Sequence, residues 1–204
     1  MGLYQRYLLP RLIDLAMRVS EVRRYRALIV PRAHGDVLEL GIGSALNLPY
    51  YGAHVQRLEG VDPSVELLAM AQHRACDAPF EIELLPSPAE SLPLADASFD
   101  CVVTTFTLCS VGDPAAAMRE ARRVLKPGGR LLFAEHGLAP EESVRRWQHR
   151  LNPVWRKLAG GCNLDRRIDD IVEQAGFTLG DIQRGYARGP RPFAYIYCGE
   201  ARAS

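Results

Sequence analysis

The chain has 204 residues, of which 48% are hydrophobic and 24% are charged, and its formal net charge is +1. This length suits one domain with an ample core, and this composition is typical of a soluble globular protein. A net charge so close to zero gives no overall basis for binding nucleic acid, so we expect no such partner. Charged residues at Arg6, Arg11 and Asp14 interrupt any signal-peptide core. No apolar run reaches the roughly 18 residues that a membrane span requires.

Five cysteines occur along the chain, and none of them belongs to a Cys-x-x-Cys pair. An odd number of cysteines without that spacing is typical of reduced thiols, so we expect a cytoplasmic location. Zinc sites usually show paired ligands at short spacing. We therefore expect no metal site.

The first 34 residues are expected to form a helical lid in front of the main domain. Apolar residues recur at helical spacing over residues 3–19, and an arginine-rich helix is expected over residues 21–30. The arginines of these two helices suit a solvated face. They would also suit peripheral contact with an anionic membrane surface.

Strands and helices alternate over residues 35–135, as in a doubly wound parallel sheet. Helices are expected after the first strand, from Pro63 to about Arg74, and from Pro114 to near Leu125. The apolar and alternating runs predict strands at residues 36–40, 55–61, 81–85, 101–105 and 130–135.

The rest of the chain is expected to add a helical insertion at about residues 136–165 and two closing strands at 177–183 and 193–198. No crossover helix separates those two strands, which predicts a terminal antiparallel hairpin. The predicted fold is an α/β, Rossmann-like, doubly wound sheet of seven strands. The sheet is mostly parallel and belongs to a domain that covers residues 35–204.

A glycine turn follows the first predicted strand, in the segment Glu39-Leu40-Gly41-Ile42-Gly43-Ser44-Ala45. Two glycines one residue apart let the backbone turn tightly and approach a ligand closely. The third glycine of the dinucleotide fingerprint is missing, because Leu46 stands at its place. The Glu39 carboxylate would repel a pyrophosphate but attract the ammonium and sulfonium groups of S-adenosylmethionine. The turn therefore favours S-adenosylmethionine as the cofactor.

More polar residues are expected at the same edge of the sheet, where the loops after parallel strands converge. Asp62 ends the second strand, where its carboxylate can accept hydrogen bonds from ribose hydroxyls. Ala89 and Glu90 follow the third strand, beside the expected adenine. Thr105 and Phe106 follow the fourth strand, beside the expected methionine portion.

These segments resemble the motifs of the class I S-adenosylmethionine-dependent methyltransferases. The matching segments, in family order, are Glu39-Leu40-Gly41-Ile42-Gly43, Gly60-Val61-Asp62-Pro63-Ser64, Ser98-Phe99-Asp100 and Arg123-Val124-Leu125-Lys126-Pro127-Gly128-Gly129. Ala45 departs from the family at a position where glycine is usual, and Pro88 at one where aspartate is usual. The resemblance implies a cofactor site made by Glu39, Gly41, Ile42, Gly43, Asn47, Asp62, Pro63, Ala89, Glu90, Thr105 and Phe106.

A narrower resemblance, to the methyltransferase-like seven group of alkyl thiol methyltransferases, lies in residues 107–111, 135–136 and 161–166. Animal members of this group methylate small alkyl thiols and are held to membranes by an N-terminal hydrophobic segment. No such segment opens this sequence, so we expect a soluble relative. The resemblance implies a small, fairly apolar acceptor, with a thiol favoured. The candidate pocket residues are Tyr7, Cys109, Trp147, Trp155 and Cys162.

His136 is the candidate general base, because it directly follows the fifth strand. A thiol acceptor would demand little of such a base, since a modest fall in the pKa of the thiol gives the thiolate at neutral pH. His136 could instead only shape the loop by hydrogen bonding, and Cys109 could be a buried structural thiol. Trp147 and Trp155 lie eight residues apart, so both are expected to pack the insertion helix against the core and to offer an apolar wall.

Three alternative functions remain open. The first is N- or C-methylation of phospholipid headgroups or quinone-type lipids, which the basic N-terminal helices would suit. The second is a non-catalytic module that binds S-adenosylmethionine and regulates a partner. The third is RNA methylation, which ranks last because the sequence lacks an extended basic and aromatic surface. The oligomeric state is not predicted.

Overall fold

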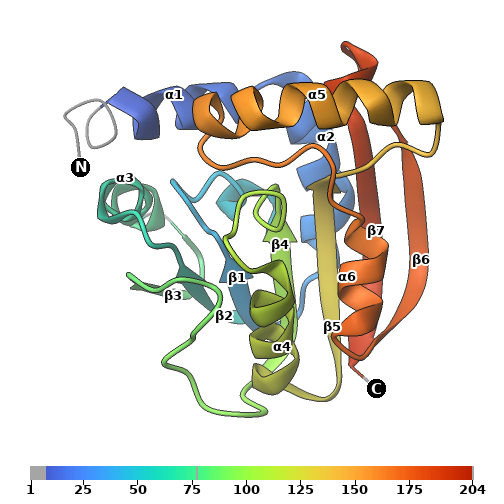
Figure 1. The fold of residues 1–204 in the computed structure, drawn as a ribbon. Helices are drawn as coiled ribbons and strands as arrows, with labels where there is room; N and C mark the ends of the chain where they lie inside the picture. Colours follow the sequence, from blue (N-terminus) through green and yellow to red (C-terminus); the bar gives the residue numbers. More distant parts are fainter. Residues whose placement is uncertain (1–7, 77, 204) are drawn as a thin grey trace.

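The computed structural model describes residues 8–76 and 78–203, and within them the strands form one seven-stranded sheet flanked by helices (Figure 1). The order of the strands across the sheet is β3-β2-β1-β4-β5-β7-β6. The strands are β1 (Gly35–Leu40), β2 (Val55–Val61), β3 (Glu81–Leu85), β4 (Phe99–Thr105), β5 (Leu125–His136), β6 (Phe177–Tyr186) and β7 (Tyr195–Ala203). The helices are α1 (Leu9–Ala16), α2 (Ser20–Ile29), α3 (Val65–Ala75), α4 (Pro114–Val124), α5 (Glu142–Leu158) and α6 (Ile168–Gln174).

The sheet has the predicted mixture of parallel and antiparallel pairs. Strands β1 to β5 pair in parallel, whereas β7 runs antiparallel to both β5 and β6. The strand order reverses at β1, which has β2 on one side and β4 on the other. Leu40, at the end of β1, is level with Val61 of β2 and Thr104 of β4. The loops that follow these strands therefore leave the sheet at one place, as expected of a ligand site in this architecture.

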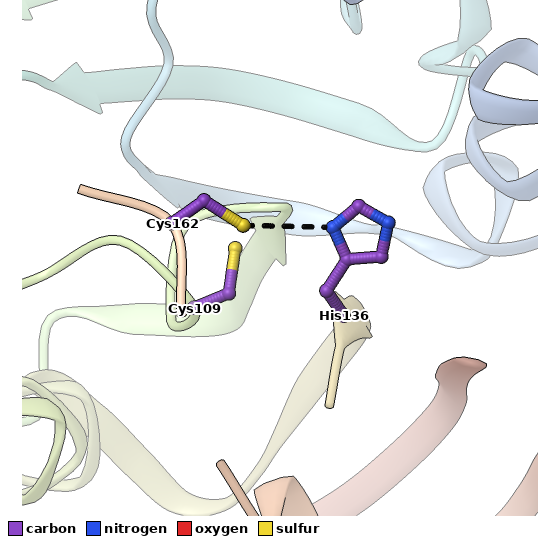
Figure 2. Close-up of side chains that lie close together, drawn as sticks. All are labelled: Cys109, His136 and Cys162. Atoms are coloured by element: carbon purple, nitrogen blue, oxygen red, sulfur yellow. Dashed lines mark hydrogen bonds between the residues drawn. The ribbon is translucent and has the colours of Figure 1, made fainter. Parts of the chain in front are cut away.

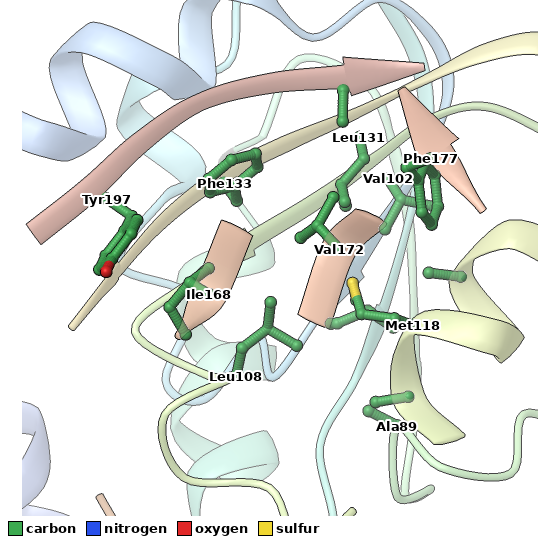
Figure 3. Packing of buried hydrophobic residues seen from close by; sticks show 14 of the residues in the cluster. Ala89, Val102, Leu108, Met118, Leu131, Phe133, Ile168, Val172, Phe177 and Tyr197 are labelled. Atoms are coloured by element: carbon green, nitrogen blue, oxygen red, sulfur yellow. The ribbon is translucent and has the colours of Figure 1, made fainter. Parts of the chain in front are cut away.

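Two apolar clusters cover the two faces of the sheet, because side chains of a strand alternate between its faces. One cluster lies between the sheet and helices α4 and α6, and Figure 3 shows part of it, with Met118 of α4 and Val172 of α6 beside Leu131 and Phe133 of β5. The other cluster joins the sheet to α2 and α3, through residues such as Ile29. Both faces of the central parallel strands β1 and β4 are thus buried over most of their length, whereas the edge strand β3 is partly exposed.

The segment after the glycine turn differs from the prediction. No α-helix follows β1; the chain turns through residues 41–47 into a single 3₁₀ turn at Leu48–Tyr50. Gly41, Gly43 and Ala45 all have left-handed backbone conformations, with φ of 65°, 55° and 60°. These conformations cannot belong to a right-handed helix, and Pro49 lies within the 3₁₀ turn. The segment after β1 is accordingly a series of turns and not the short helix that the sequence predicted.

The N-terminal helices divide into a packed one and an exposed one. Ile29 of α2 and the following Val30 are buried in the core, so α2 is part of the main fold. On α1, by contrast, Leu12 and Leu15 are 45% and 67% exposed, although their spacing predicted a buried face. The expected helix over residues 3–19 ends at Ala16, and α1 lies beside the end of α5 (Figure 1).

The insertion forms as predicted, with α5 ended by Gly160 and Gly161, whose φ values are 61° and 95°. The expected turn at residues 126–129 lies inside β5, where the pairing with β4 shifts register. No helix within residues 8–76 and 78–203 combines the length and apolar character needed to cross a membrane.

Candidate active site

The glycine turn after β1 lies between the loops that follow β2 and β4. A Cβ on Gly41 would overlap the side chain of Thr107, so glycine is needed there for close packing. A Cβ on Gly43 would meet no atom closer than 3.9 Å, so that side of the turn is open. The backbone N–H of Gly43 donates to Asp62 Oδ2 at 3.0 Å. The turn thus combines a packed side with an accessible side, as a ligand-binding turn requires.

Glu39 lies beneath this turn and is 2% exposed. Its two oxygens accept hydrogen bonds from Asn47 Nδ2 at 2.8 Å and from the Tyr51 hydroxyl at 2.7 Å. Burial raises the pKa of Glu39 to about 7, although the Tyr51 hydrogen bond and the charge of Arg26 oppose that shift. The carboxylate is therefore poised to gain a positive partner, because a cation would offset the cost of its burial.

Asn47 links β1 to β4, because its amide nitrogen donates to both Glu39 and Thr105 Oγ1, at 2.8 and 3.0 Å. Its Oδ1 atom is buried and has no hydrogen-bond partner. A buried acceptor of this kind is costly unless a ligand or water satisfies it. The ammonium group of S-adenosylmethionine would satisfy Asn47 Oδ1 and compensate Glu39, so these residues fit the predicted cofactor.

Asp62 ends β2 as predicted and is 8% exposed. The backbone N–H groups of Gly43 and Ser64 donate to its two oxygens, at 3.0 and 2.8 Å. These bonds orient the carboxylate and leave lone pairs for ribose hydroxyls. Ser64, rather than Pro63, caps helix α3 by accepting from the N–H of Leu67. Burial raises the pKa of Asp62.

The loop after β3 is anchored to the turn that precedes helix α4. Ala89 is buried in the core, and Glu90 Oε1 accepts from the N–H groups of Gly112 and Asp113, at 2.9 and 3.3 Å. The Glu90 side chain therefore holds the turn before α4. A role for Ala89 and Glu90 in binding adenine through their backbone stays a prediction.

The loop after β4 is held by Glu135, a fully buried residue near the end of β5 that the sequence did not single out as a site residue. Its Oε1 accepts from Thr104 Oγ1 at 2.8 Å and from the N–H of Thr107 at 3.0 Å, and its Oε2 accepts from the N–H of Cys109 at 3.3 Å. Phe106 lies between these contacts with φ of 56°, which is rare for an aromatic residue. Such strain is typical of ligand-binding loops.

Cys109 from the loop after β4, His136 at the end of β5 and Cys162 from the loop after α5 lie close together (Figure 2). The sulfur atoms of Cys109 and Cys162 and a ring nitrogen of His136 all lie within 4.8 Å of one another. Cys162 Sγ is 3.7 Å from His136 Nδ1, and the His136 ring meets the Phe106 ring edge to face at 5.3 Å. The structure thus brings together the predicted base and two predicted pocket residues.

The pKa values of the two thiols are shifted in opposite directions. The hydrogen bond from Cys109 lowers the pKa of the Cys162 thiol, and the hydrogen bond with His136 lowers it further. The same Cys162 hydrogen bond, together with burial, raises the pKa of Cys109. Cys162 is therefore the member of the pair that carries negative charge more readily.

Hydrogen bonds between two loops hold the two cysteines close to each other. The sequence spacing did not predict these bonds. The backbone N–H and the side-chain amide of Asn163 both donate to the Cys109 carbonyl, at 2.7 and 2.9 Å. Arg166 donates to the neighbouring Leu108 carbonyl. The loop after β4 and the loop between α5 and α6 are thereby joined.

The two tryptophans of α5 do not share a role. Trp155 packs against Phe193 with ring centroids 4.7 Å apart, and it lies near enough to Cys162 to lower its pKa. Trp147 is 55% exposed, so the prediction that it packs the helix down is wrong. Residues eight apart on an α-helix are rotated by about 80°, which places the second ring outside the packed face. Tyr7 lies outside the described residues.

Asp14 connects α1 to this site and was not singled out from the sequence. It is 6% exposed, accepts from the Ser44 hydroxyl of the glycine turn, and pairs with Arg74 of α3 at 3.0 Å. An isolated acidic residue among the arginines of the first 32 residues is the sequence signal that could have identified it. The expectation that residues 1–34 act as a lid stays a prediction. The contacts of Asp14 with Ser44 and Arg74 support it for α1.

A cavity of about 510 Å³ lies at the other end of the sheet, between the start of β5 and helix α4. Its lining includes Arg119, Arg123 and Lys126, and none of the predicted site residues borders it. Arg123 and Lys126 form ion pairs with nearby carboxylates. The cavity is therefore separate from the candidate active site.

Comparisons with known proteins all find methyltransferases. A family model described as a methyltransferase domain matches residues 38–133. Thiol S-methyltransferase TMT1B of Rattus norvegicus is 34% identical over 169 residues, which cover 80% of this chain and 66% of the relative. Phosphatidylethanolamine N-methyltransferase of Cereibacter sphaeroides is 36% identical over 175 residues, which cover 81% of this chain and 85% of the relative. The chain thus spans slightly less than two thirds of the rat relative's length.

A solved structure of an S-adenosylmethionine-dependent methyltransferase from Mesorhizobium loti has the same fold. The two structures superpose with a TM-score of 0.68 at 19% identity, over 93% of this chain and 99% of the other. The strand order, the glycine turn and the match to the Cereibacter sphaeroides enzyme over most of its length all indicate the same family. This chain belongs to the class I S-adenosylmethionine-dependent methyltransferases.

Proposed function

We propose that this chain transfers the methyl group of S-adenosylmethionine to a small, fairly apolar thiol. The observation that carries the proposal is the meeting of Cys109, His136 and Cys162, with the His136 ring packed against Phe106. A thiolate is stabilised by neighbouring imidazole and thiol hydrogen-bond donors. The relative named thiol S-methyltransferase supports the same acceptor class.

Three residues are proposed to hold the methyl donor. Glu39 and the unsatisfied Oδ1 of Asn47 would receive its ammonium group, and Asp62 would receive its ribose hydroxyls. The sulfonium group of the bound donor supplies an already activated methyl carbon. The task left to the chain is to align the acceptor with that carbon and to keep water away.

His136 is proposed to let the acceptor react as a thiolate. Its imidazole receives the proton of the acceptor thiol, and a thiol needs a weaker base than an alcohol or an amide would. The acceptor sulfur then forms a bond to the methyl carbon as the carbon–sulfur bond of the donor breaks. Trp155 and Phe193 would provide apolar contacts near this point.

Methylation of a phospholipid headgroup or a quinone-type lipid is the second candidate. The observation in its favour is the relative from Cereibacter sphaeroides, named phosphatidylethanolamine N-methyltransferase, which this chain matches over 85% of that protein. The matched family domain covers residues 38–133, so it leaves out His136 and Cys162, which lie on the acceptor side. Cofactor similarity alone therefore does not decide between the two acceptors.

The test is an assay of S-adenosylhomocysteine release against small alkyl thiols, phosphatidylethanolamine and a quinol. We expect turnover with the alkyl thiols and none with their alcohol analogues of equal chain length. Turnover confined to the lipid headgroup or the quinol would overturn the thiol proposal and favour the second candidate. Calorimetric binding of S-adenosylmethionine with no turnover on any acceptor would instead favour a non-catalytic binding module.

A further inference from the structure

The group formed by Cys109, His136 and Cys162 has the composition of a metal site. Two thiols and one imidazole come from the loop after β4, the end of β5 and the loop between α5 and α6 (Figure 2). Cys109 and Cys162 are 1% and 8% exposed, and His136 is half-buried. Sulfur and imidazole ligands in a largely dry site are preferred by zinc.

The spacing of these groups fits a tetrahedral ion. Zinc binds sulfur at about 2.3 Å and imidazole nitrogen at about 2.0–2.1 Å, so two such ligands on a tetrahedron lie about 3.6 Å apart. The observed separation of Cys162 Sγ from His136 Nδ1 is 3.7 Å. Cys109 lies within 4.8 Å of both partners, so a modest side-chain rotation would bring it into range.

The surrounding contacts would hold such a site in shape. Asn163 donates twice to the Cys109 carbonyl, and Glu135 accepts from the Cys109 N–H, so the backbone of this ligand is held from two sides. The buried Trp155 indole nitrogen has no hydrogen-bond partner of normal geometry, although the ring lies near Cys162. A metal-bound thiolate at Cys162 would offer that N–H an acceptor, as outer-shell donors commonly find in metal sites.

We propose that Cys109, His136 and Cys162 bind one Zn²⁺ ion. Two thiolates and a neutral imidazole would balance the charge of the ion. Three protein ligands leave a fourth position open, which is the arrangement of catalytic rather than structural zinc.

The open position is proposed to take the acceptor thiol, and this part rests on the proposed function. Binding to the ion lowers the pKa of the thiol, whose proton leaves to solvent. The acceptor sulfur then forms its bond to the methyl carbon, the carbon–sulfur bond of the donor breaks, and the electron pair stays on the departing sulfur. The ion undergoes no redox change. In the zinc-bound protein His136 is a ligand, and the ion takes over the task that its imidazole has in the metal-free protein.

Metal binding is tested on the full chain, reduced, stripped with a chelator and reloaded with Zn²⁺ or Co²⁺. We expect about one ion per chain after dialysis, measured by mass spectrometry of the metal, and a thiolate-to-cobalt charge-transfer band. The Cys109→Ser/Cys162→Ser double variant should lose both signals at least tenfold. Cys76→Ser, at an exposed thiol, and Cys101→Ser, at a buried thiol outside the group, should keep them. Circular dichroism checks that each variant is folded.

Equal metal content in the wild type and the folded double variant would overturn the site, as would its absence from both. Addition of an alkyl thiol to the cobalt form should strengthen the charge-transfer band, whereas the matching alcohol should not. Thiol methylation that survives chelation unchanged, with no ion bound, would refute the zinc inference and leave the proposed function standing. Zinc bound as expected, with no turnover of any thiol, would refute the proposed function and leave the site standing.

Discussion

Glu39 and Asp62 are both buried at the end of neighbouring strands, but different donors hold them. Side chains from Asn47 and Tyr51 hold Glu39, whereas backbone N–H groups hold Asp62. A carboxylate with side-chain donors can exchange one of them for a ligand cation, and a carboxylate fixed by backbone donors offers a rigid acceptor. This division suits Glu39 to the methionine end of the donor and Asp62 to the ribose.

Glu39→Ala and Asp62→Ala should each weaken binding of S-adenosylmethionine by roughly 10- to 100-fold or more, because each removes a buried, charge-assisted contact. Isothermal titration calorimetry on the folded variants measures the effect. Glu83→Ala, which removes an exposed carboxylate on β3, is the control and should bind like the wild type. Wild-type affinity in both site variants would refute the cofactor site.

His136→Ala should lower kcat/KM for an alkyl thiol by roughly 100-fold or more, the size expected when a proton acceptor or a metal ligand is lost. The affinity for S-adenosylmethionine should stay within about threefold, because the contacts proposed for the donor involve other residues. Steady-state assays and calorimetry together measure both quantities. His73→Ala, at an exposed histidine of α3, should change neither. A thiol turnover rate unaffected by His136→Ala would leave this residue with a structural role only.

At the scale of elements, α1 and α5 present an exposed apolar surface above the ends of the parallel strands (Figure 1). On these two helices the exposed large apolar residues are Leu12, Leu15, Trp147, Val154 and Leu158. Exposed Arg11, Arg146, Arg150, Arg156 and Lys157 accompany them. Apolar side chains flanked by cations are characteristic of surfaces that lie on anionic bilayers. The membrane contact predicted for the basic N-terminal helices stays a prediction, and we extend it to α5.

The chain should sediment with vesicles that contain an anionic phospholipid, and less with neutral vesicles. A Leu15→Glu/Leu158→Glu variant should reduce that binding at least tenfold, because both side chains are about two-thirds exposed and the new charges would be repelled. Val65→Glu, at an exposed valine of α3, is the matched control and should bind normally. Failure of the wild type to bind anionic vesicles would show that lipid does not cover this surface. The same conclusion would follow if the wild type formed a dimer in solution that the double variant dissociated.

At the scale of the whole molecule, the buried carboxyl of Glu39 links folding to pH. Its pKa is about 7 in the folded chain and about 4.5 when unfolded, so the folded state binds this proton more tightly. The stability that it contributes is complete below about pH 4.5 and is lost as the pH rises through about 7, by roughly 3 kcal/mol in total. Asp62 and Glu135, whose pKa values are also raised by burial, act in the same direction.

Glu39→Gln should therefore flatten part of the decline in unfolding free energy between about pH 5 and pH 7.5, measured by urea denaturation. Saturating S-adenosylmethionine should stabilise the wild type more at pH 7.5 than at pH 5, because its ammonium group favours the charged carboxylate. Identical pH profiles for the wild type and Glu39→Gln would show that Glu39 does not titrate in this range.

Much of the fold was predictable because its signals are local. The ranges of β2 and β3 match the prediction to the residue, since apolar alternation and flanking turn residues mark strands directly. The missing helix after β1 was not predictable, because the left-handed conformations of three alternate residues, one of them Ala45, depend on how that turn packs. The apolar spacing of α1 was real but misleading, because spacing shows which residues share a face and not what covers it.

By itself, the sequence determined the sheet class, the glycine turn and the methyl donor, and it predicted the two carboxylates of the candidate donor site. Each of these follows from neighbours along the chain or from the order of short motifs. Only the tertiary structure decided that Cys109, His136 and Cys162 share one site, because Asn163 and Arg166 join loops that no spacing relates. The same holds for Asp14, whose burial results from contacts with Ser44 and Arg74. The candidate donor site could be predicted from residues adjacent in the sequence, whereas the candidate acceptor site depends on contacts between distant ones.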